Sequence, residues 1–393
     1  MKRIDLQGNI VYTFCFFLLF IISGCKPEPP TPQPPPDPPD LLQLDFITGM
    51  DLSYQPLMEA LDVPYYDQNA DKITDMVDFV QANGVNLVRL RLFHSPDLND
   101  SILGFSNLER VLAYGERIVQ SGNKILLDIH YSDTWADPGT QKLPAAWSGL
   151  SFQQVNDSVY QYTLRILQAF QQKNALPYMV QIGNETNSGF LWDHGRVWGA
   201  FESNWPNYAA LIKSGINAVE KIETESGKEI YTMLHVAGVV NQNTFFQRID
   251  QEGVEYDLIG LSHYHLHHTR DLNQLQSALN QLADAYQKPI IIVETNYPWT
   301  LDWNDWTHNG VGEQGQLITG YPASPEGQKA YTEKLIEILE AVPDNLGAGF
   351  VWWAPDLVAY DGEESTNGSA FENLTVFDFD NRALPVMDVF RDH

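Results

Sequence analysis

The chain has 393 residues, of which 44% are hydrophobic and 12% aromatic, and its formal net charge is −28. This apolar content can bury a large core, which excludes an intrinsically disordered protein. The excess of acidic side chains repels nucleic acid, anionic lipid and polyanionic substrates, so we expect a neutral ligand and no nucleic-acid partner.

The first 24 residues have the layout of a secretory signal. Lys2 and Arg3 precede the apolar run 10–22, and Ser23-Gly24-Cys25 closes that run. Residues 22–25 resemble a bacterial lipobox, in which the residue matching Cys25 becomes the lipidated first residue of the mature chain. A single membrane-spanning helix is the alternative, but the run is short for a bilayer. We predict a signal peptide at 1–24 and an exported lipoprotein of the outer membrane and cell surface.

A proline-rich stretch follows the signal. Residues 26–40 read KPEPPTPQPPPDPPD, a composition that favours an extended polyproline helix over a packed core. We predict that residues 25–43 are a lipidated cysteine with a linker and that residues 44–393 are one folded domain. Cys15 would leave with the signal, so the mature chain could form no internal disulfide.

Within the predicted domain, short apolar runs alternate with longer helical patterns. Alternation of this kind predicts parallel strands joined by helical crossovers. The eight expected strands are Phe46–Met50, Val85–Leu92, Lys124–His130, Tyr178–Ile182, Glu229–His235, Tyr256–Ser262, Pro289–Val293 and Ala348–Trp353. The expected helices are Asp71–Ala82, Leu108–Val119, Phe152–Gln171, Tyr208–Ile222, Leu272–Tyr286 and Ser324–Ala341.

Eight such units predict a single (β/α)8 TIM barrel of the α/β class, with an active site at the carboxyl ends of the strands. A doubly wound open sheet is the alternative. No GxGxxG or GxxxxGK[ST] sequence follows a strand, which excludes the usual nucleotide fingerprints.

Two of the predicted strands end in a glutamate. Tyr178–Ile182 is followed by Gly183-Asn184-Glu185, and Pro289–Val293 is followed by Glu294. A single glutamate after a strand is commonly a solvated or helix-capping residue. Two that face each other across a barrel mouth can cleave a glycosidic bond, because one protonates the leaving oxygen while the other attacks the anomeric carbon or activates water.

Other strand ends carry side chains that could serve these carboxylates. An ionised nucleophile needs a nearby cation or hydroxyl group, for which Arg89 and Tyr264 are candidates, and a protonated acid needs burial or a second carboxylate to raise its pKa. Trp353 could give a sugar ring an aromatic face. Taken alone, Arg89 and His130 could equally be satisfied polar groups of the core.

Several segments of the domain are similar to those of one enzyme family. They are Gly49–Tyr54, His130–Gly139, Val180–Glu185, Val293–Thr300, Phe371–Asn373, Phe377–Asp380 and Ala383–Pro385. From about Gly49 to Phe390 the chain resembles glycoside hydrolase family 53, the endo-β-1,4-galactanases. The third-strand stretch HYSDTWADPG is the most specific of these segments.

The resemblance implies a retaining barrel enzyme with Glu185 as acid/base and Glu294 as nucleophile. The reaction would be a double displacement through a covalent galactosyl enzyme, with Asn184 on the 2-hydroxyl of the cleaved sugar. The resemblance also implies supporting roles at matching positions. Arg89, His130 and Tyr264 would orient the nucleophile and adjust its pKa. Trp353 would lie beneath the same sugar. The residues lining the glycone side of the cleft would be Asp51, Asp133 and Trp135.

Two stretches depart from the family pattern. After the sixth strand the family usually reads like SYYP, then an aromatic residue and Trp-His, where this chain has Ser262-His263-Tyr264-His265-Leu266-His267-His268. After the eighth strand Trp353-Ala354-Pro355 lacks the family's glutamate. Both catalytic glutamates are present, so the reaction class is unaffected, whereas distal subsites and product length are left open.

Two metals deserve consideration. The histidine run 263–268 suggests zinc, but a loop cluster without cysteine and with only Asp271 as a nearby carboxylate is a weak signal. Calcium fits better, since some family members bind it in the loops after strands seven and eight, where Asp302 and Asn304 lie. We expect no cofactor in the chemistry and a structural calcium ion at Asp302 and Asn304.

We therefore expect an endo-acting retaining hydrolase of β-1,4-galactosidic bonds in pectic galactan and type I arabinogalactan. Neutral galactan is not repelled by an acidic surface. The expected partners are this polysaccharide and, through Cys25, a membrane, and we expect a monomer. The alternatives are another retaining endo-glycanase of the same clan, acting on arabinan, mannan or xylan, and a non-catalytic glycan-binding surface lipoprotein. Paired glutamates argue against the last, because a binding protein needs no acid/base.

Overall fold

The computed structural model describes residues 41–393, which form a compact unit. The predicted signal peptide 1–24, the predicted lipidation site Cys25 and the linker up to residue 40 lie outside the described residues. The unit begins at Leu41 rather than at Leu44, because Leu41 and Leu42 already pack against its core.

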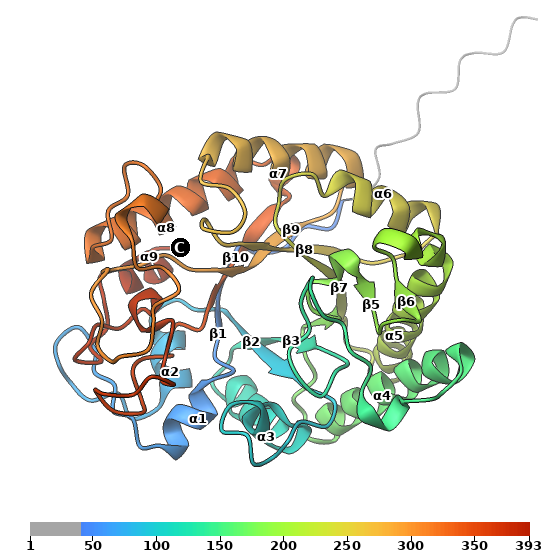
Figure 1. Cartoon of the computed structure of the whole chain (residues 1–393), viewed down its shortest axis with the longest axis horizontal. Helices are drawn as coiled ribbons and strands as arrows, with labels where there is room; N and C mark the ends of the chain where they lie inside the picture. The colour runs from blue at the N-terminus through green and yellow to red at the C-terminus, as the bar shows by residue number, and fades with distance from the viewer. Residues whose placement is uncertain (1–40) are drawn as a thin grey trace, which may run out of the picture. The chain divides into compact units, whose positions relative to one another are not determined.

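Eight parallel strands close into a barrel (Figure 1). They are β1 (Ile47–Asp51), β2 (Leu87–Leu92), β3 (Lys124–Ile129), β4 (Met179–Ile182), β7 (Tyr231–Ala237), β8 (Leu258–His263), β9 (Ile290–Thr295) and β10 (Gly347–Trp353). Each strand pairs with its neighbours in chain order, and β10 closes on β1, with Val351 beside Gly49. The predicted (β/α)8 barrel is confirmed, and the closure excludes an open sheet with two edge strands.

Helices surround the barrel (Figure 1). They are α1 (Gln55–Ala60), α2 (Met76–Ala82), α3 (Leu108–Gln120), α4 (Phe152–Gln172), α5 (Trp205–Ser226), α6 (Asn243–Gln251), α7 (Leu272–Tyr286), α8 (Pro325–Glu340) and α9 (Met387–Arg391). Polar caps set several of the boundaries. Ser151 and Gln154 form a capping box at α4, and the Asp271 carboxylate accepts backbone N–H groups at the start of α7.

All six predicted helices are present, and α7 has the predicted ends. The short helices α1, α6 and α9 and the hairpin β5 (Gly189–Phe190) with β6 (Gly195–Arg196) were not predicted, since so few residues carry little periodicity. Loops between these elements contain short 3-10 helices. These are η1 (Leu103–Ser106), η2 (Ala145–Trp147), η3 (Thr186–Ser188), η4 (Gly199–Asn204), η5 (Gln314–Gln316), η6 (Pro343–Asn345) and η7 (Glu372–Leu374).

The barrel interior is layered. A separate apolar cluster fills the part of the interior towards the amino ends of the strands. Its members include Leu87, Leu126, Met179 and Met233. Alternate residues of a strand share one face. The residues two positions further along these four strands therefore enter the next layer towards the carboxyl ends, and they are Arg89, Asp128, Gln181 and His235. The same periodicity thus builds an apolar floor and a polar layer above it.

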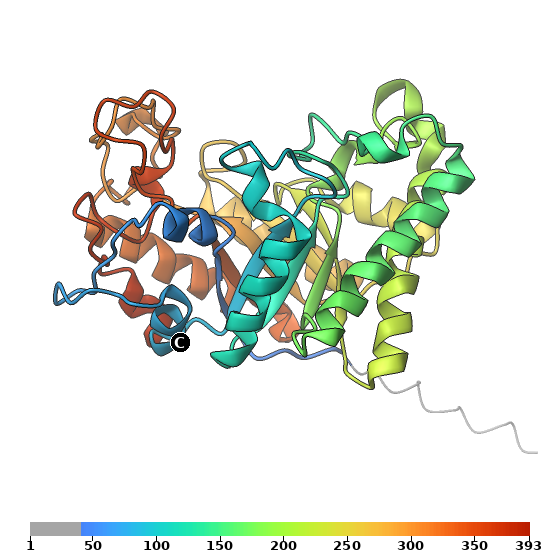
Figure 2. The same ribbon diagram turned by 90° about the horizontal axis from the view of Figure 1, so that it is seen from below.

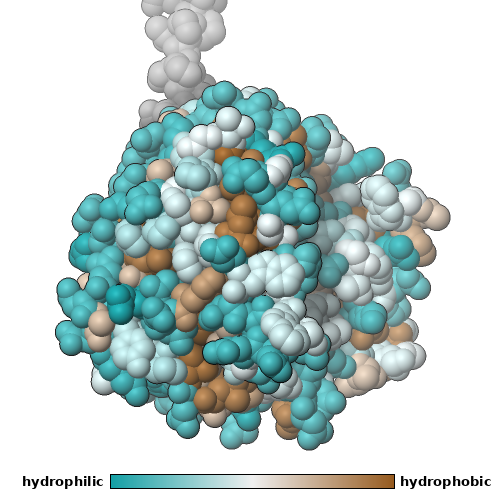
Figure 3. All heavy atoms as spheres, turned by 60° about the vertical axis from the view of Figure 1, so that its left-hand side comes forward, coloured by the Kyte–Doolittle hydropathy of each residue, from teal (hydrophilic) through white to brown (hydrophobic). Residues whose placement is uncertain are grey.

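Figure 2 shows that the loops after β3, β4, β9 and β10 rise on the same side of the barrel. On the face that Figure 3 brings forward, hydrophilic side chains predominate and apolar ones form small groups between them. None of the helices within residues 41–393 is long and apolar enough to cross a membrane.

Candidate active site

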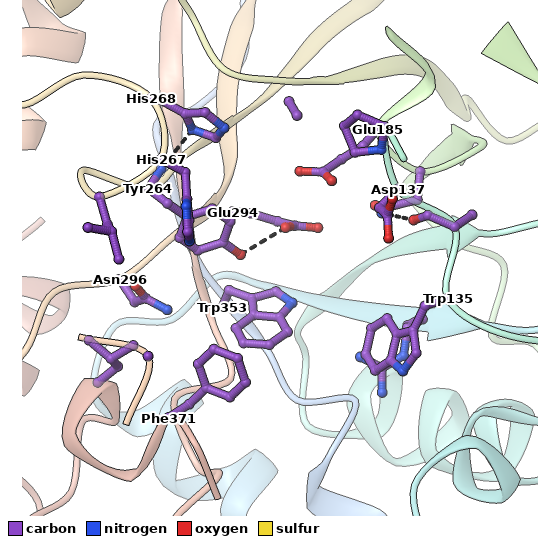
Figure 4. Close-up of a pocket in the computed structure, with 18 of the residues that line it drawn as sticks. Trp135, Asp137, Glu185, Tyr264, His267, His268, Glu294, Asn296, Trp353 and Phe371 are labelled. Atoms are coloured by element: carbon purple, nitrogen blue, oxygen red, sulfur yellow. Dashed lines mark hydrogen bonds between the residues drawn. The ribbon is translucent and has the colours of Figure 1, made fainter. Parts of the chain in front are cut away.

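A cleft of about 650 Å³ opens at the carboxyl ends of the strands. Eight of the predicted catalytic and substrate-binding residues line it, namely Arg89, His130, Trp135, Asn184, Glu185, Tyr264, Glu294 and Trp353. The other two, Asp51 and Asp133, are not among its lining residues. Figure 4 shows the carboxyl groups of Glu185 and Glu294 pointing towards one another.

Glu294 reaches the cleft through a β-bulge. Against β8 the pairing of β9 passes from Ile292 directly to Glu294, and the register against β10 shifts at the same place. Val293 belongs to the apolar floor, and Glu294 beside it lines the cleft. Consecutive side chains of a regular strand point to opposite faces, and an extra residue in one strand removes that constraint. We predicted that Glu294 directly follows its strand, but the structure places it within β9.

The carboxylate of Glu294 is buried beside a cation and a hydroxyl group. Arg89 Nη2 lies 2.8 Å from Oε1, and the Tyr264 hydroxyl donates a hydrogen bond to Oε2 at 2.8 Å. The pKa of Glu294 is raised because burial outweighs the Arg89 charge and the Tyr264 hydrogen bond, which both lower it. The predicted tuning residues Arg89 and Tyr264 therefore both contact the predicted nucleophile.

Arg89 connects Glu294 to two further carboxylates. Its Nη1 lies 2.7 Å from Asp51 and its Nη2 lies 2.8 Å from Asp128. Burial alone would raise the pKa of Asp128, but the charges of Arg89 and His130 lower it to about 2. Asp51 thus forms an ion pair with Arg89. It is not among the residues that line the cleft, whereas we predicted it on the glycone side. His130 acts on Glu294 only indirectly, because its Nε2 contacts Asp128 at 3.0 Å.

Glu185 adopts a left-handed backbone conformation, with φ 48° and ψ 56°, which is uncommon outside glycine and often marks functional sites. Ser262 donates a hydrogen bond to its Oε1 at 2.5 Å. His235 Nε2 lies 2.9 Å from the Ser262 hydroxyl, and His235 Nδ1 accepts the backbone N–H of Glu185 at 3.3 Å. Burial and, second, the charge of Glu294 raise the pKa of Glu185 to about 8.

The two glutamates are close. The Ser262 hydroxyl lies 2.5 Å from Glu185 Oε1 and 3.5 Å from Glu294 Oε2, so these oxygens are at most about 6 Å apart. Carboxyl groups about 5–5.5 Å apart are typical of retaining glycosidases, and inverting enzymes have a wider separation to admit water.

The remaining predicted substrate residues are held firmly. Asn184 donates to the carbonyl of Ala136 at 2.8 Å and accepts from Arg89 at 3.0 Å. Trp353 is packed edge-to-face by Tyr54, Tyr264 and Phe371. The guanidinium group of Arg91 lies 4.1 Å from the centre of the Trp135 ring. These contacts orient the cleft side chains before any ligand binds.

Asp133 has a different role from the one predicted. Its carboxylate accepts the backbone N–H groups of Ser95 at 3.0 Å and Ala145 at 2.8 Å. It therefore joins the loops after β2 and β3 instead of lining the glycone side of the cleft.

The predicted metal ligands lie away from the cleft. Asp302 is exposed, and the backbone N–H of Asn304 donates to Glu372 at 2.6 Å. Within residues 41–393, no group of three or more histidine, cysteine, aspartate and glutamate side chains is arranged to hold a metal ion.

Sequence analysis missed three buried polar residues of the site, Asp128, Gln181 and Ser262. Gln181 lies 2.6 Å from Asp128 and 2.9 Å from His235 Nδ1, and so links the Arg89 group to the Glu185 group. Each is a polar residue in an apolar run. The alternation of faces along the two predicted strands could have identified Asp128 and Gln181. Each lies two positions after a residue that faces the barrel interior.

Comparisons with known proteins identify the family of the chain. The family model described as glycosyl hydrolase family 53 matches residues 47–390. An arabinogalactan endo-β-1,4-galactanase of Cellvibrio japonicus is 37% identical over 351 residues, covering 88% of this chain and 90% of that protein. An endo-β-1,4-galactanase of Bacillus subtilis is 31% identical, covering 88% and 86%.

A solved structure is also similar. The family 53 catalytic domain of Ignisphaera aggregans superposes with a TM-score of 0.81 at 35% identity, covering 89% of this chain and 96% of that one. The match of the family model over most of the barrel and the paired glutamates at its mouth lead to one conclusion. The chain belongs to glycosyl hydrolase family 53 and is a glycosidase.

Proposed function

We propose that this protein cleaves β-1,4-galactosidic bonds inside pectic galactan and type I arabinogalactan, with retention of anomeric configuration. The observation that carries the mechanism is the unequal environment of two carboxyl groups at most about 6 Å apart. Arg89 and Tyr264 stabilise the ionised form of Glu294, and the resulting negative charge keeps the proton on Glu185.

In the first step Glu185 gives its proton to the glycosidic oxygen as the carboxylate of Glu294 attacks the anomeric carbon. The bond from that carbon to the leaving oxygen breaks, and a covalent galactosyl ester of Glu294 forms. Ser262 donates to Oε1 of Glu185, so the acidic proton belongs on Oε2. The arginine and tyrosine hold the attacking carboxylate in place.

In the second step Glu185, now ionised, takes a proton from water, and the oxygen of that water attacks the anomeric carbon. The ester bond to Glu294 breaks and both carboxyl groups return to their starting states. Two inversions at the same carbon give net retention. The side chain of Asn184 lies between Arg89 and the third-strand loop, and in this proposal it binds the 2-hydroxyl group.

Two observations support an internal cut in a neutral polymer. Lining residues continue on both sides of the glutamates, with Trp135 and Trp353 on one side and His268 on the other (Figure 4). The formal charge of −28 disfavours a uronic-acid backbone. The names of the Cellvibrio and Bacillus relatives point to galactan as the polymer.

Product analysis tests this proposal. We expect short galacto-oligosaccharides with β-anomeric configuration from β-1,4-galactan, and no release from arabinan, mannan or xylan under the same conditions. Cleavage of one of those polymers instead would replace the proposed substrate. α-Configured initial products would exclude the double displacement.

We also propose that Cys25 is lipidated and anchors an exported monomer to the outer membrane at the cell surface. The supporting observation is the lipobox-like sequence before the proline-rich stretch. Metabolic fatty-acid labelling of the wild type and of Cys25→Ala tests the anchor, protease accessibility on whole cells tests the orientation, and light scattering tests the oligomeric state.

A calcium ion in the loops after β9 and β10 remains our proposal, with a changed set of ligands. Asp305 Oδ2, Glu372 Oε2 and Asn309 Oδ1 are buried oxygens without a hydrogen-bond partner. A Cβ on Gly368 would lie 2.2 Å from Asp305 Oδ2, so only glycine allows the carboxylate its close approach at this position. Burial and, after it, the charge of Asp305 raise the pKa of Glu372 to about 7. A calcium ion, which binds oxygen ligands, would relieve this repulsion and stiffen the loops.

A further inference from the structure

Four histidines lie between the last residue of β8, His263, and His268. His263 and His265 are buried, and neither ring nitrogen of either residue has a hydrogen-bond partner within residues 41–393. His265, His267 and His268 line the cleft. The mechanism above uses none of the four.

His268 has a defined tautomer. The backbone N–H of Tyr264 donates to its Nδ1 at 3.0 Å, and a ring nitrogen that accepts a hydrogen bond carries no proton. The proton of the neutral ring is therefore on Nε2. Burial and, second, the charge of His267 lower the pKa of His268 to about 4. At neutral pH the ring is an uncharged donor with one N–H group.

One edge of the ring is fixed by a hydrogen bond, and the other edge faces a glycine. Gly238, just after β7, has φ +80°, and a Cβ at this position would lie 3.3 Å from Cδ2 of His268. The backbone of Tyr264, whose hydroxyl contacts Glu294, fixes the opposite edge through Nδ1. Within the described part of the chain, Nε2 of His268 has no hydrogen-bond partner, which leaves this donor available to a ligand.

The position of the ring relative to the glutamates identifies that ligand. In Figure 4, Trp353 and Trp135 lie on one side of Glu185 and Glu294, and His268 lies on the other. If the sugar under attack rests on Trp353, the leaving sugar that Glu185 protonates extends towards His268. We propose that His268 Nε2–H donates a hydrogen bond to an oxygen of the leaving sugar and so determines specificity on that side of the scissile bond. This inference rests on the proposed function.

Two substitutions separate the roles of the ring nitrogens. In His268→Asn the side-chain oxygen can still accept from Tyr264, but nothing reaches the position of Nε2. In His268→Gln the longer amide can place an N–H near that position. His308→Gln is the matched control, since His308 is exposed and is not among the cleft residues.

The test compares two substrates for each variant. One is β-1,4-galactotetraose, whose leaving group is a sugar, and the other is a nitrophenyl β-galactobioside, whose activated leaving group offers no such sugar. For His268→Asn we expect kcat/KM on the tetraose to fall about 10- to 100-fold, as for loss of a hydrogen bond to a polar ligand group. On the aryl substrate we expect a change below about threefold, and His268→Gln should recover most of the loss.

Equal losses on both substrates would overturn the inference, because they would mean that His268 acts through Glu185 or the fold. Unchanged kinetics in His268→Asn would overturn it as well. A third readout is transfer of the galactosyl group to added galactobiose, which should fall in His268→Asn because the acceptor occupies the same position. A wild-type protein inactive on both substrates would overturn the proposed function and the inference with it.

Discussion

The carboxyl groups of Glu185 and Glu294 approach the same hydroxyl group, Ser262 Oγ, at 2.5 and 3.5 Å. Their other contacts differ. Glu294 has a cation at 2.8 Å, whereas Glu185 has no positively charged side chain within salt-bridge distance in residues 41–393. The first of the two to ionise is therefore Glu294, and its charge makes ionisation of Glu185 harder.

This asymmetry predicts different rescue products for the two glutamates. With an activated aryl galactobioside and added azide, Glu294→Ala should yield the α-galactosyl azide, because azide attacks once in place of the carboxylate. Glu185→Ala should yield the β-galactosyl azide, because the ester still forms and azide then replaces water. NMR of the products distinguishes them. Azide products of the opposite configuration would reverse the two roles.

The pH dependence of kcat/KM should fall on the alkaline side near the pKa of Glu185, which is about 8. Glu185 must be protonated to act, so activity is lost as the pH rises through this value. The Ser262 hydrogen bond lowers that pKa, so Ser262→Ala should move the alkaline limb to higher pH. Ser106→Ala, which removes a buried hydroxyl without a partner, is the control. A limb that stays in place in Ser262→Ala would contradict this account.

Asp128→Asn should lower the free energy of unfolding at neutral pH by about 2 kcal/mol, the equivalent of a pKa lowered from 3.8 to about 2. A carboxyl group with a lowered folded-state pKa stabilises the fold above its unfolded-state value. The difference between wild type and variant should therefore close as the pH falls from about 4 to about 2. Urea unfolding across this range measures it, and a difference independent of pH would refute the assignment.

Trp353→Ala should lower kcat/KM on galactan about 10- to 100-fold, because the ring supplies a stacking face for the sugar. Trp198→Ala is the matched control, since Trp198 is 69% exposed and lies outside the cleft lining. A comparable loss of kcat/KM in both variants would mean that the cleft position of Trp353 is unimportant.

Calcium should raise the thermal midpoint of the wild type, and a chelator should reverse the effect. Asp305→Asn with Glu372→Gln should abolish this response, because these are the buried carboxylates. Asp302→Asn should preserve it, because Asp302 is exposed. If Asp302→Asn alone removed the response, the original pair of ligands, Asp302 and Asn304, would be reinstated.

Sequence reasoning could place Glu185 and Glu294 at the barrel mouth because both follow apolar runs with strand-like composition. It could not identify Ser262 as the group between them, since that contact depends on the register of β8 against β9. It also misplaced Asp51 and Asp133. Asp51 ends β1 and its side chain faces Arg89, whereas Asp133 lies in the loop after β3 and its side chain faces the backbone of two loops. The position of a residue along its strand predicts which layer of the barrel its side chain enters. Which side chains it contacts there depends on how the strands pair in the closed barrel.

The bulge in β9 has a consequence for anyone who redesigns this barrel. It places Val293 and Glu294, adjacent in the chain, on the inner side of one strand, the first in the floor and the second in the cleft. An idealised backbone with strict alternation would turn one of them outwards into the helical ring. Regularising the strand while keeping both residues would thus take either Val293 out of the floor or Glu294 out of the cleft.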